Sequence, residues 1–171
     1  MTPELAVVYI HSKYEAKPPE EVLKTALPFF PENTIPIVVD GSKILDITAC
    51  LNRGVDTAAS FGAQYWFWLH SDMSFENLKW YPELRDTLIA YPEVLKVCAS
   101  NSRDPIQPLR IGQEQTYLMR VADFQKYPWL RFHEGFLRCG GAEDYYQHYE
   151  ILRHGFLVII IPTAQIEHRG A

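Results

Sequence analysis

The segment Gln64-Tyr-Trp-Phe-Trp-Leu69 is an almost unbroken apolar run, and His70, Ser71 and Asp72 follow it directly. A short continuous run of aromatic and aliphatic residues is typical of a strand that is covered on both faces. Such strands occur in parallel sheets that carry helices on both sides. The run therefore predicts an interior strand, and the polar residues after it mark the point where that strand ends.

The segments before this run extend the pattern toward the N-terminus. Apolar runs from Leu5 to Ile10 and from Thr34 to Val39 predict two more strands, with a helical pattern from Pro18 to Leu27 between them. A second helix is expected from about Ile44 to Phe61, because its apolar residues recur near helical spacing and a glycine follows. This alternation predicts an α/β fold of the Rossmann-like, doubly wound kind, with a mostly parallel central sheet flanked by helices.

The second part of the chain continues the alternation less regularly. The expected helices lie near Tyr81–Ala90, Ala122–Tyr127 and Ala142–His154, and the expected strands lie near Val94–Ala99, Thr116–Val121 and Phe156–Ile161. Pro162 is expected to stop the last strand. The polar stretch from Ser100 to Gln115 carries two prolines and is expected to be a loop.

Length and charge limit the classes of protein to consider. A chain of 171 residues with 47% hydrophobic composition is expected to form a single domain, residues 1–171. The formal net charge of −5 argues against a surface built to neutralise many phosphates, so nucleic-acid binding is not indicated.

The cysteines and the N-terminus bear on location. Cys50, Cys98 and Cys139 are widely spaced and form neither a disulfide framework nor a CxxC metal motif, which fits a reducing cytoplasm. No signal-peptide pattern and no apolar stretch long enough for a transmembrane segment is found. A cytoplasmic protein is expected.

Ligands of open α/β sheets bind beyond the carboxyl ends of the strands. Four groups of polar residues are expected at that edge: Asp40-Gly41-Ser42, His70-Ser71-Asp72, Glu143-Asp144 and His168. Each group alone has a simpler explanation, which is an Asx-turn at Asp40, a turn cap at Asp72, a helix-dipole contact for the Glu-Asp pair or a solvated histidine. Their expected position at one edge favours a functional site.

The order and spacing of these groups resemble family 2 glycosyltransferases of the GT-A fold, in the nucleotide-diphospho-sugar transferase superfamily. The resemblance covers nearly the whole chain. Its motifs are the turn Ile10-His-Ser-Lys-Tyr-Glu15, the acidic turn Asp40-Gly41-Ser42, the element Asn52-Arg53-Gly54-Val55, the DXD-like His70-Ser71-Asp72, the segment Gly140-Gly141-Ala142-Glu143-Asp144, and Gly155, Pro162 and His168.

The resemblance implies a nucleotide-diphosphate sugar donor and a divalent cation, Mn²⁺ or Mg²⁺. It places Asp72 and His168 as metal ligands, and an imidazole ligand tilts the preference toward Mn²⁺. It places Asp40 against the base or ribose of the donor. The other residues expected near the donor are His11, Ser42, Asn52, His70 and Ser71.

The resemblance also implies inverting transfer of one sugar to a hydroxyl. Asp144 is expected to be the general base, since a helix N-terminus favours its charged form, and Glu143 is the alternate base or an acceptor contact. Residues of about 1–75 form the expected nucleotide-binding half, and residues of about 94–171 the acceptor and catalytic half. The acceptor can be a glycan, a lipid-linked group, a protein or a small molecule.

Departures from the family pattern leave other functions open. His11 replaces a proline, Leu51 replaces an arginine, and His70 replaces the first acid of DXD. These changes motivate an alternative, a catalytically silent GT-A-like domain that binds a nucleotide or a partner. A nucleotidyltransferase ranks last, because His11 to Lys17 contains no glycine for a phosphate loop.

The acceptor side carries no sharp motif. Tyr127, Trp129 and Phe132 are either an aromatic platform for a sugar or part of the core. Arg120 and Arg138 are either phosphate or acceptor contacts or surface residues. The chain ends at Ala171 without the Gln-x-x-Arg-Trp element of processive synthases, so transfer of a single sugar is expected rather than polymerisation.

Overall fold

The computed structural model describes residues 2–13, 17–42, 46–101, 116–134 and 142–168, with the backbone alone for 142–144. The strands are β1 (Leu5–His11), β2 (Thr34–Asp40), β3 (Tyr65–Leu69), β4 (Met73–Ser74), β5 (Val94–Asn101), β6 (Tyr117–Arg120) and β7 (Leu157–His168). The α-helices are α1 (Pro19–Ala26), α2 (Ile47–Ser60), α3 (Trp80–Ala90), α4 (Val121–Lys126) and α5 (Ala142–Arg153). Two short 3₁₀ helices are η1 (Leu27–Phe29) and η2 (Pro128–Leu130).

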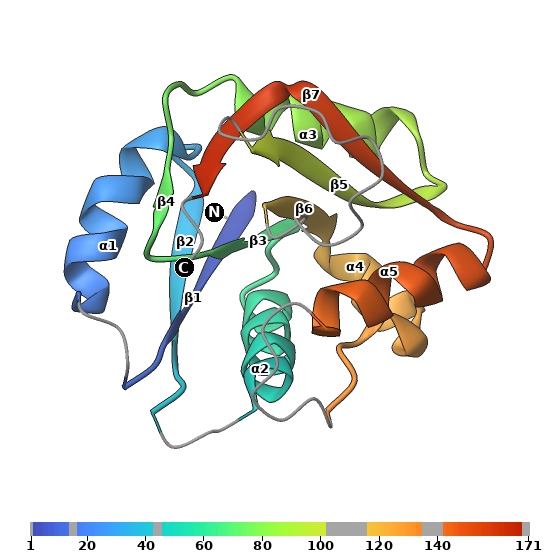
Figure 1. The fold of residues 1–171 in the computed structure, drawn as a ribbon, viewed down its shortest axis with the longest axis horizontal. Coiled ribbons are helices and arrows are strands. Elements are labelled where there is room, and N and C mark those ends of the chain that lie inside the picture. The colour runs from blue at the N-terminus through green and yellow to red at the C-terminus, as the bar shows by residue number, and fades with distance from the viewer. Residues whose placement is uncertain (1, 14–16, 43–45, 102–115, 135–141, 169–171) are drawn as a thin grey trace.

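The described strands form one mixed sheet in the order β2-β1-β3-β6-β5-β7-β4 (Figure 1). The long pairings are parallel, between β1 and both β2 and β3 and between β5 and β7. The short strand β6 lies between β3 and β5 and runs antiparallel to both. The prediction of a single α/β domain with a central sheet and flanking helices is confirmed.

Helices cover both faces of the sheet, with α1 and α3 on one side and α2, α4 and α5 on the other (Figure 1). The strand β3 supplies Phe67 to the core on the α1 side and Trp66 to the core on the α2 side. Both side chains are fully buried. This explains why the sequence of β3 is apolar at every position rather than at alternate ones.

Two local features fix α2 on the sheet. Asp46 caps the helix by accepting hydrogen bonds from the backbone N–H groups of Thr48 (2.9 Å) and Ala49 (3.4 Å), so the helix begins at Ile47 rather than near the predicted Ile44. A Cβ atom at Gly54 would lie 2.4 Å from Cγ1 of Val8 on β1. The glycine therefore allows α2 to approach β1 more closely than any other residue would.

The predicted end of the last strand at Pro162 is wrong, because β7 continues to His168. Pro162 lies where the register between β5 and β7 shifts from the pair Ala99 and Ile161 to the pair Ser100 and Gln165. A proline in such an irregularity removes no regular ladder hydrogen bond. Beyond it the strand pairs again and carries His168 along the sheet.

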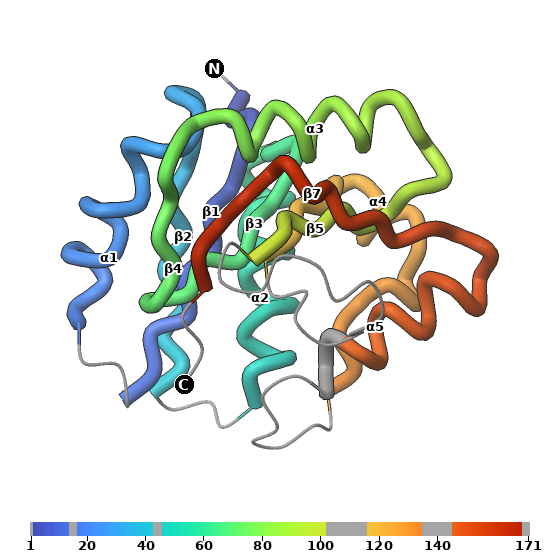
Figure 2. Tube along the Cα trace, turned by 45° about the horizontal axis from the view of Figure 1, so that its top comes forward, coloured from blue at the N-terminus to red at the C-terminus, as the bar shows by residue number. Residues whose placement is uncertain are grey.

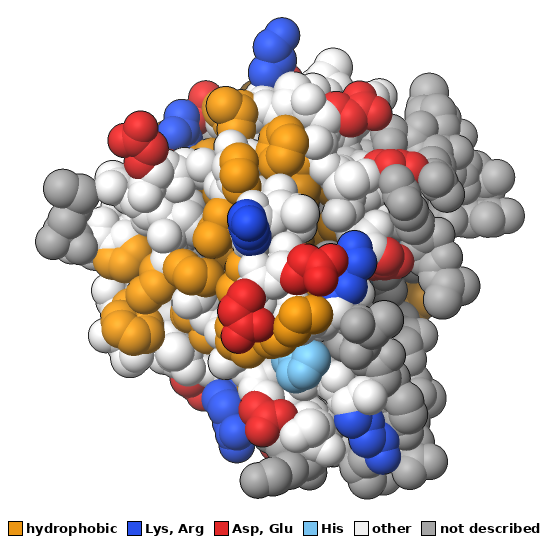
Figure 3. All heavy atoms as spheres, turned by 90° about the vertical axis from the view of Figure 1, so that its left-hand side faces the viewer, with side chains coloured by type: hydrophobic (Ala, Val, Ile, Leu, Met, Phe, Trp, Pro, Cys, Tyr) orange, Lys and Arg blue, Asp and Glu red, His pale blue; other side chains and the backbone are white. Residues whose placement is uncertain are grey.

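The described surface carries charges of both signs, and two of the three cysteines are described. Figure 3 shows basic and acidic side chains interspersed with apolar ones on the face that carries α1, without a block of one charge. Cys50 and Cys98 are buried free thiols, and Cys139 lies outside the described residues. Among the described helices, none combines the length and apolar character needed to span a bilayer.

Candidate functional site

The candidate site forms where the chain leaves β3 and meets the end of β7. After Leu69 the chain passes through His70, Ser71 and Asp72 and enters β4, which pairs antiparallel with the last residues of β7. Met73 is opposite His168 in this pairing, and Figures 1 and 2 show the two segments side by side. The pairing brings together two predicted metal ligands from distant parts of the sequence.

Three side chains converge at this point. The Nε2 atom of His168 lies 3.2 Å from Oδ1 of Asp72. One potential ligand atom from each of His70, Asp72 and His168 lies within 4.8 Å of the others. All three residues are partly buried, and the His168 side chain is 12% exposed against 35% for Asp72. Two imidazoles and a carboxylate in this arrangement are able to hold a divalent cation.

Hydrogen bonds from β5 and β4 hold the end of β7 around His168. The Asn101 side chain donates to the carbonyl of His168 (3.0 Å) and accepts from its N–H (3.3 Å). The Ser74 hydroxyl donates to Oε2 of Glu167 at 2.6 Å. Asn101 and Ser74 were not predicted as site residues, because Asn101 falls in a predicted loop and a strand of two residues leaves no periodic signal.

His70 is enclosed by rings. Its imidazole packs against Trp68, with ring centroids 4.0 Å apart, and lies edge-on to His168 at 4.9 Å. Its Nε2 atom is buried and has no hydrogen-bond partner among the described residues. Burial lowers the pKa of His70 to about 3, and repulsion from His168 adds to the shift. The ring is therefore neutral near physiological pH.

A cavity of about 120 Å³ lies beside His70 and Ser71, between the β3–β4 segment and the α1 layer. It is lined by Val22, Thr25, Ala26, Phe29, Leu69, His70, Ser71, Met73, Ser74 and Phe75. Small-molecule sites usually measure about 300 to 1,000 Å³, so this cavity is too small for a nucleotide sugar.

The expected donor contacts at the ends of β1 and β2 lie next to each other. His11 is paired with Asp40 in the parallel register, and the backbone N–H of Gly41 donates to the His11 carbonyl at 2.8 Å. Asp40 accepts hydrogen bonds from the N–H (2.9 Å) and the hydroxyl (2.5 Å) of Ser42, which is the Asx-turn that its sequence allowed. The Asp40 side chain is also exposed. The donor-binding roles of these three residues stay predictions.

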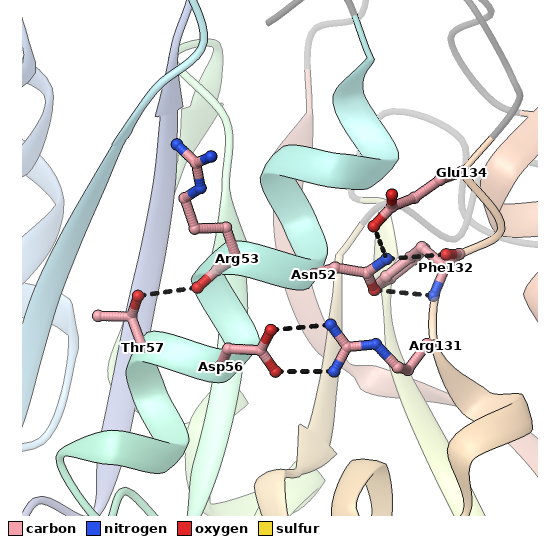
Figure 4. A network of polar contacts seen from close by, with 7 residues as sticks. All are labelled: Asn52, Arg53, Asp56, Thr57, Arg131, Phe132 and Glu134. Atoms are coloured by element: carbon pink, nitrogen blue, oxygen red, sulfur yellow. Dashed lines mark hydrogen bonds and ion pairs between the residues drawn. The ribbon is translucent and has the colours of Figure 1, made fainter.

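Asn52 contacts the segment before the predicted catalytic residues (Figure 4). Its amide donates to the carbonyl of Phe132 (2.9 Å) and accepts from its N–H (3.0 Å), and it also donates to Glu134 at 3.0 Å. One turn along α2, Asp56 forms a two-point ion pair with Arg131. Asn52 therefore fastens residues 131–134 to α2, while its expected role toward the donor is untested.

The predicted base Asp144 and its neighbour Glu143 lie at the start of α5. The helix α5 begins at Ala142, as expected, so Glu143 and Asp144 lie in its first turn. Their side chains, together with Gly140 and Gly141, lie outside the described residues. Their roles stay predictions.

Other candidates on the acceptor side have structural contacts. Arg120 donates to Asp123 (2.7 Å) and to the backbone carbonyls of Leu88 (2.6 Å) and Val94 (2.7 Å), which ties β6 to neighbouring elements. Phe132 is buried against Trp66. Phe132 is therefore part of the core, as the simpler interpretation of it has it. Arg120 is a partly buried residue that ties elements of the fold together rather than a plain surface residue, and Arg138 lies outside the described residues.

No protein-family model matches the chain, and no curated protein matches it. Its fold is similar to that of glucosyl-3-phosphoglycerate synthase from Mycobacterium tuberculosis in complex with Mn²⁺, UDP and phosphoglyceric acid. The TM-score is 0.62 and the identity 14%, over 99% of this chain and 72% of that chain.

Two further solved structures share the fold. For TarS 1–349 of S. aureus, the TM-score is 0.56 at 11% identity, over 95% of this chain and 59% of that chain. For a cytidylyltransferase from Leptospira borgpetersenii, the TM-score is also 0.56 at 11% identity, over 94% and 76% of the two chains. The chain therefore has a fold of the GT-A and nucleotidyltransferase-like type.

Proposed function

We propose that this protein is a metal-assisted glycosyltransferase, similar to family 2, that moves one sugar from a nucleotide-diphosphate donor to a hydroxyl acceptor. The observation that carries the proposal is the contact of Asp72 with His168 beside the end of β3. A similar fold has been solved with Mn²⁺ and UDP-glucose bound. These two facts together favour a cation that binds a diphosphate.

The donor set fits such a cation. Asp72 supplies a hard oxygen ligand and His168 an imidazole, which together suit Mn²⁺ better than Mg²⁺. One ring nitrogen of His70 lies within 4.8 Å of the ligand atoms of Asp72 and His168, and its Nε2 is buried without a hydrogen-bond partner among the described residues. When bound, a divalent cation would stabilise the negative charge that develops on the leaving diphosphate.

The chain's own residues would supply the remaining functions. The acceptor oxygen forms a bond to the anomeric carbon while the bond from that carbon to the diphosphate oxygen breaks, and the electron pair leaves with the diphosphate. Asp144 takes the proton of the acceptor hydroxyl, and Glu143 orients the acceptor or replaces Asp144 as base. Asp40 accepts hydrogen bonds from the base or ribose of the donor.

The other donor contacts are assigned by position. His11 and Ser42 lie beside Asp40 at the ends of β1 and β2, and Ser71 lies between the two members of the DXD-like motif. Asn52 is assigned to the donor by its place in the element Asn52-Arg53-Gly54-Val55. Residues of about 1–75 form the nucleotide-binding half in this proposal.

A nucleotidyltransferase is the second candidate, because cytidylyltransferases share the fold at similar TM-scores. One is the enzyme from Leptospira borgpetersenii, and another is CMP:2-keto-3-deoxy-manno-octonic acid synthetase complexed with CTP, with a TM-score of 0.53 at 12% identity. Such an enzyme would bind a nucleoside triphosphate and release pyrophosphate. Nucleotide preference therefore separates the two candidates.

Calorimetry with nucleotides tests the proposal. We expect UDP to bind in the presence of Mn²⁺, UMP to bind at least tenfold more weakly because it lacks the second phosphate, and Asp72→Ala to abolish the Mn²⁺-dependent part. The matched control is Asp86→Ala, which removes an exposed carboxylate on α3. UDP binding that is insensitive to both metal and Asp72→Ala would favour the silent domain, and a preference for CTP over UDP would favour the nucleotidyltransferase.

A further inference from the structure

His70 occupies the position of the first acid in the DXD-like motif and lies within the cluster formed by Asp72 and His168. Its ring meets the His168 ring edge-on, with centroids 4.9 Å apart. The substitution therefore does not remove a polar group from the site. It exchanges a carboxylate for an imidazole that still lies close to the other two side chains.

The buried Nε2 atom of His70 has no hydrogen-bond partner among the described residues. A buried polar atom without a partner destabilises a fold, so its presence calls for a reason. Packing against Trp68 accounts for the position of the ring but does not satisfy this nitrogen. A metal ion shared with Asp72 and His168 would satisfy it.

The geometry suits one cation. Two ligand atoms that each lie about 2.1 Å from a cation and subtend a right angle are about 3 Å apart. The measured separation of 3.2 Å between His168 Nε2 and Asp72 Oδ1 is close to this value. The ligand atoms of all three side chains lie within 4.8 Å of one another, and two ligands of one ion are at most about 4.2 Å apart, so the cluster contracts when the three atoms share an ion.

We infer that His70 is a third protein ligand, and that the site binds a transition-metal cation such as Mn²⁺, Co²⁺ or Zn²⁺ in preference to Mg²⁺, without needing the nucleotide. Two nitrogen ligands and one oxygen ligand suit these borderline cations, whereas Mg²⁺ prefers oxygen ligands and gives up its water reluctantly. The inference rests on the proposed function only in treating Asp72 and His168 as ligands.

The surroundings of the cluster hold it in this arrangement without a nucleotide. Asn101 forms two hydrogen bonds with the backbone of His168, and the pairing of β4 with β7 places Met73 opposite His168. The chain between Leu69 and Met73 thus has both ends held in the sheet. A site whose ligands are already held loses little entropy when a cation binds.

Titration of the nucleotide-free protein with Co²⁺ tests the inference through the visible absorption of the bound ion. We expect one Co²⁺ per chain, displaced by stoichiometric Zn²⁺ and by about a tenfold excess of Mn²⁺ over protein, but not by the same excess of Mg²⁺. His70→Ala should weaken Co²⁺ binding at least tenfold and alter the absorption band. His70→Asp should retain binding but allow Mg²⁺ to compete, because it restores a second oxygen ligand.

His154→Ala is the control, because His154 is another histidine whose ring stacks on a tryptophan, Trp129, but at an exposed position. It should leave Co²⁺ affinity unchanged. Thermal unfolding of each variant without metal checks that His70→Ala is folded. If His70→Ala does not fold, competition of Mg²⁺ with Co²⁺ in His70→Asp tests the inference instead. Equal Co²⁺ affinity in wild type and His70→Ala, or equal competition by Mg²⁺ and Zn²⁺ in wild type, would overturn the inference.

The two proposals fail separately. Suppose that UDP binds in the presence of Mn²⁺, that Asp72→Ala abolishes this binding, and that His70→Ala leaves both UDP and metal affinity unchanged. The proposed function then stands, and the third ligand is refuted. If Co²⁺ binds through His70 but no nucleotide binds, the metal site stands and the proposed function is refuted.

Discussion

The Nε2 atom of His168 lies 3.2 Å from Oδ1 of Asp72 although β7 and β3, the strands that lead to them, are separated in the sheet by β6 and β5. The contact exists because the chain turns after Asp72 and pairs with the end of β7 as β4. The geometry of the cluster therefore depends on contacts made by residues that are not themselves metal ligands. Removing these contacts should lower the affinity of the site for metal.

Asn101→Ala removes the two hydrogen bonds that hold the backbone of His168. We expect Mn²⁺ affinity, measured by electron paramagnetic resonance of the free ion, to fall about 10-fold to 100-fold, as is typical when the support of a metal ligand is lost. Asn77→Ala serves as the control, because Asn77 caps the backbone N–H of Lys79 away from the cluster. Equal Mn²⁺ affinity in both variants would show that Asn101 does not position His168.

Gly54→Ala should destabilise the fold, although alanine normally stabilises a helix relative to glycine by about 1 kcal/mol. The new Cβ would lie 2.4 Å from Cγ1 of Val8, so α2 must move away from β1. We expect a loss of about 1–3 kcal/mol in the free energy of unfolding, measured with urea. Arg53→Ala, at an exposed position of the same helix, should change it by less than about 0.5 kcal/mol. A Gly54→Ala protein as stable as wild type would contradict the close approach.

The ion pair of Asp56 with Arg131 predicts a pH dependence (Figure 4). Hydrogen bonds from Arg131 lower the pKa of Asp56 below its ordinary value of 3.8. The pair therefore contributes stability above that ordinary value, and the contribution is lost as the pH falls through the lowered pKa. Because the side chains are 58% and 38% exposed, the coupling should stay below about 1 kcal/mol.

A double-mutant cycle with Asp56→Ala and Arg131→Ala measures this coupling by urea unfolding between about pH 7 and about pH 3. The coupling should be constant near neutrality and fade at the acid end. A coupling that grows as the pH falls would show that the carboxylate is not the form that Arg131 stabilises.

Asp144→Asn should keep donor binding and lose transfer, because it removes the proposed base without changing the size of the side chain. With water as the acceptor, the probe is release of UDP from UDP-glucose in the presence of Mn²⁺. We expect the rate to fall at least a hundredfold while the dissociation constant of UDP stays within about twofold. Glu143→Gln is the comparison, and a larger loss there would move the base to Glu143.

Much of the fold could be predicted because strands and helices leave periodic signals over five or more residues. The unbroken apolar run at β3 indicated a strand covered on both faces, and the helices α1, α2, α3, α4 and α5 lie within a few residues of their predicted bounds. The direction of β6 and the continuation of β7 past Pro162 were not predictable in this way. Both depend on which strands become neighbours.

The candidate site could be predicted where a polar residue that can bind a metal comes after a predicted strand. Asp72 and His168 were expected as ligands, and the structure brings them together. His70 was expected at the donor rather than in the same cluster, because sequence alone does not show which way its ring turns. The hydrogen bonds of Asn101 to His168 depend on the register between β5 and β7, which are far apart in the sequence, so no local pattern predicted them.

The central claim is that Asp72 and His168 hold a cation that binds the donor diphosphate. A crystal soaked with Mn²⁺ and UDP and measured at the manganese absorption edge tests it directly. We predict one anomalous peak about 2.2 Å from Asp72 Oδ1 and His168 Nε2, with diphosphate oxygens completing the coordination. A peak elsewhere on the chain, or UDP bound with its diphosphate far from these two side chains, would contradict the account.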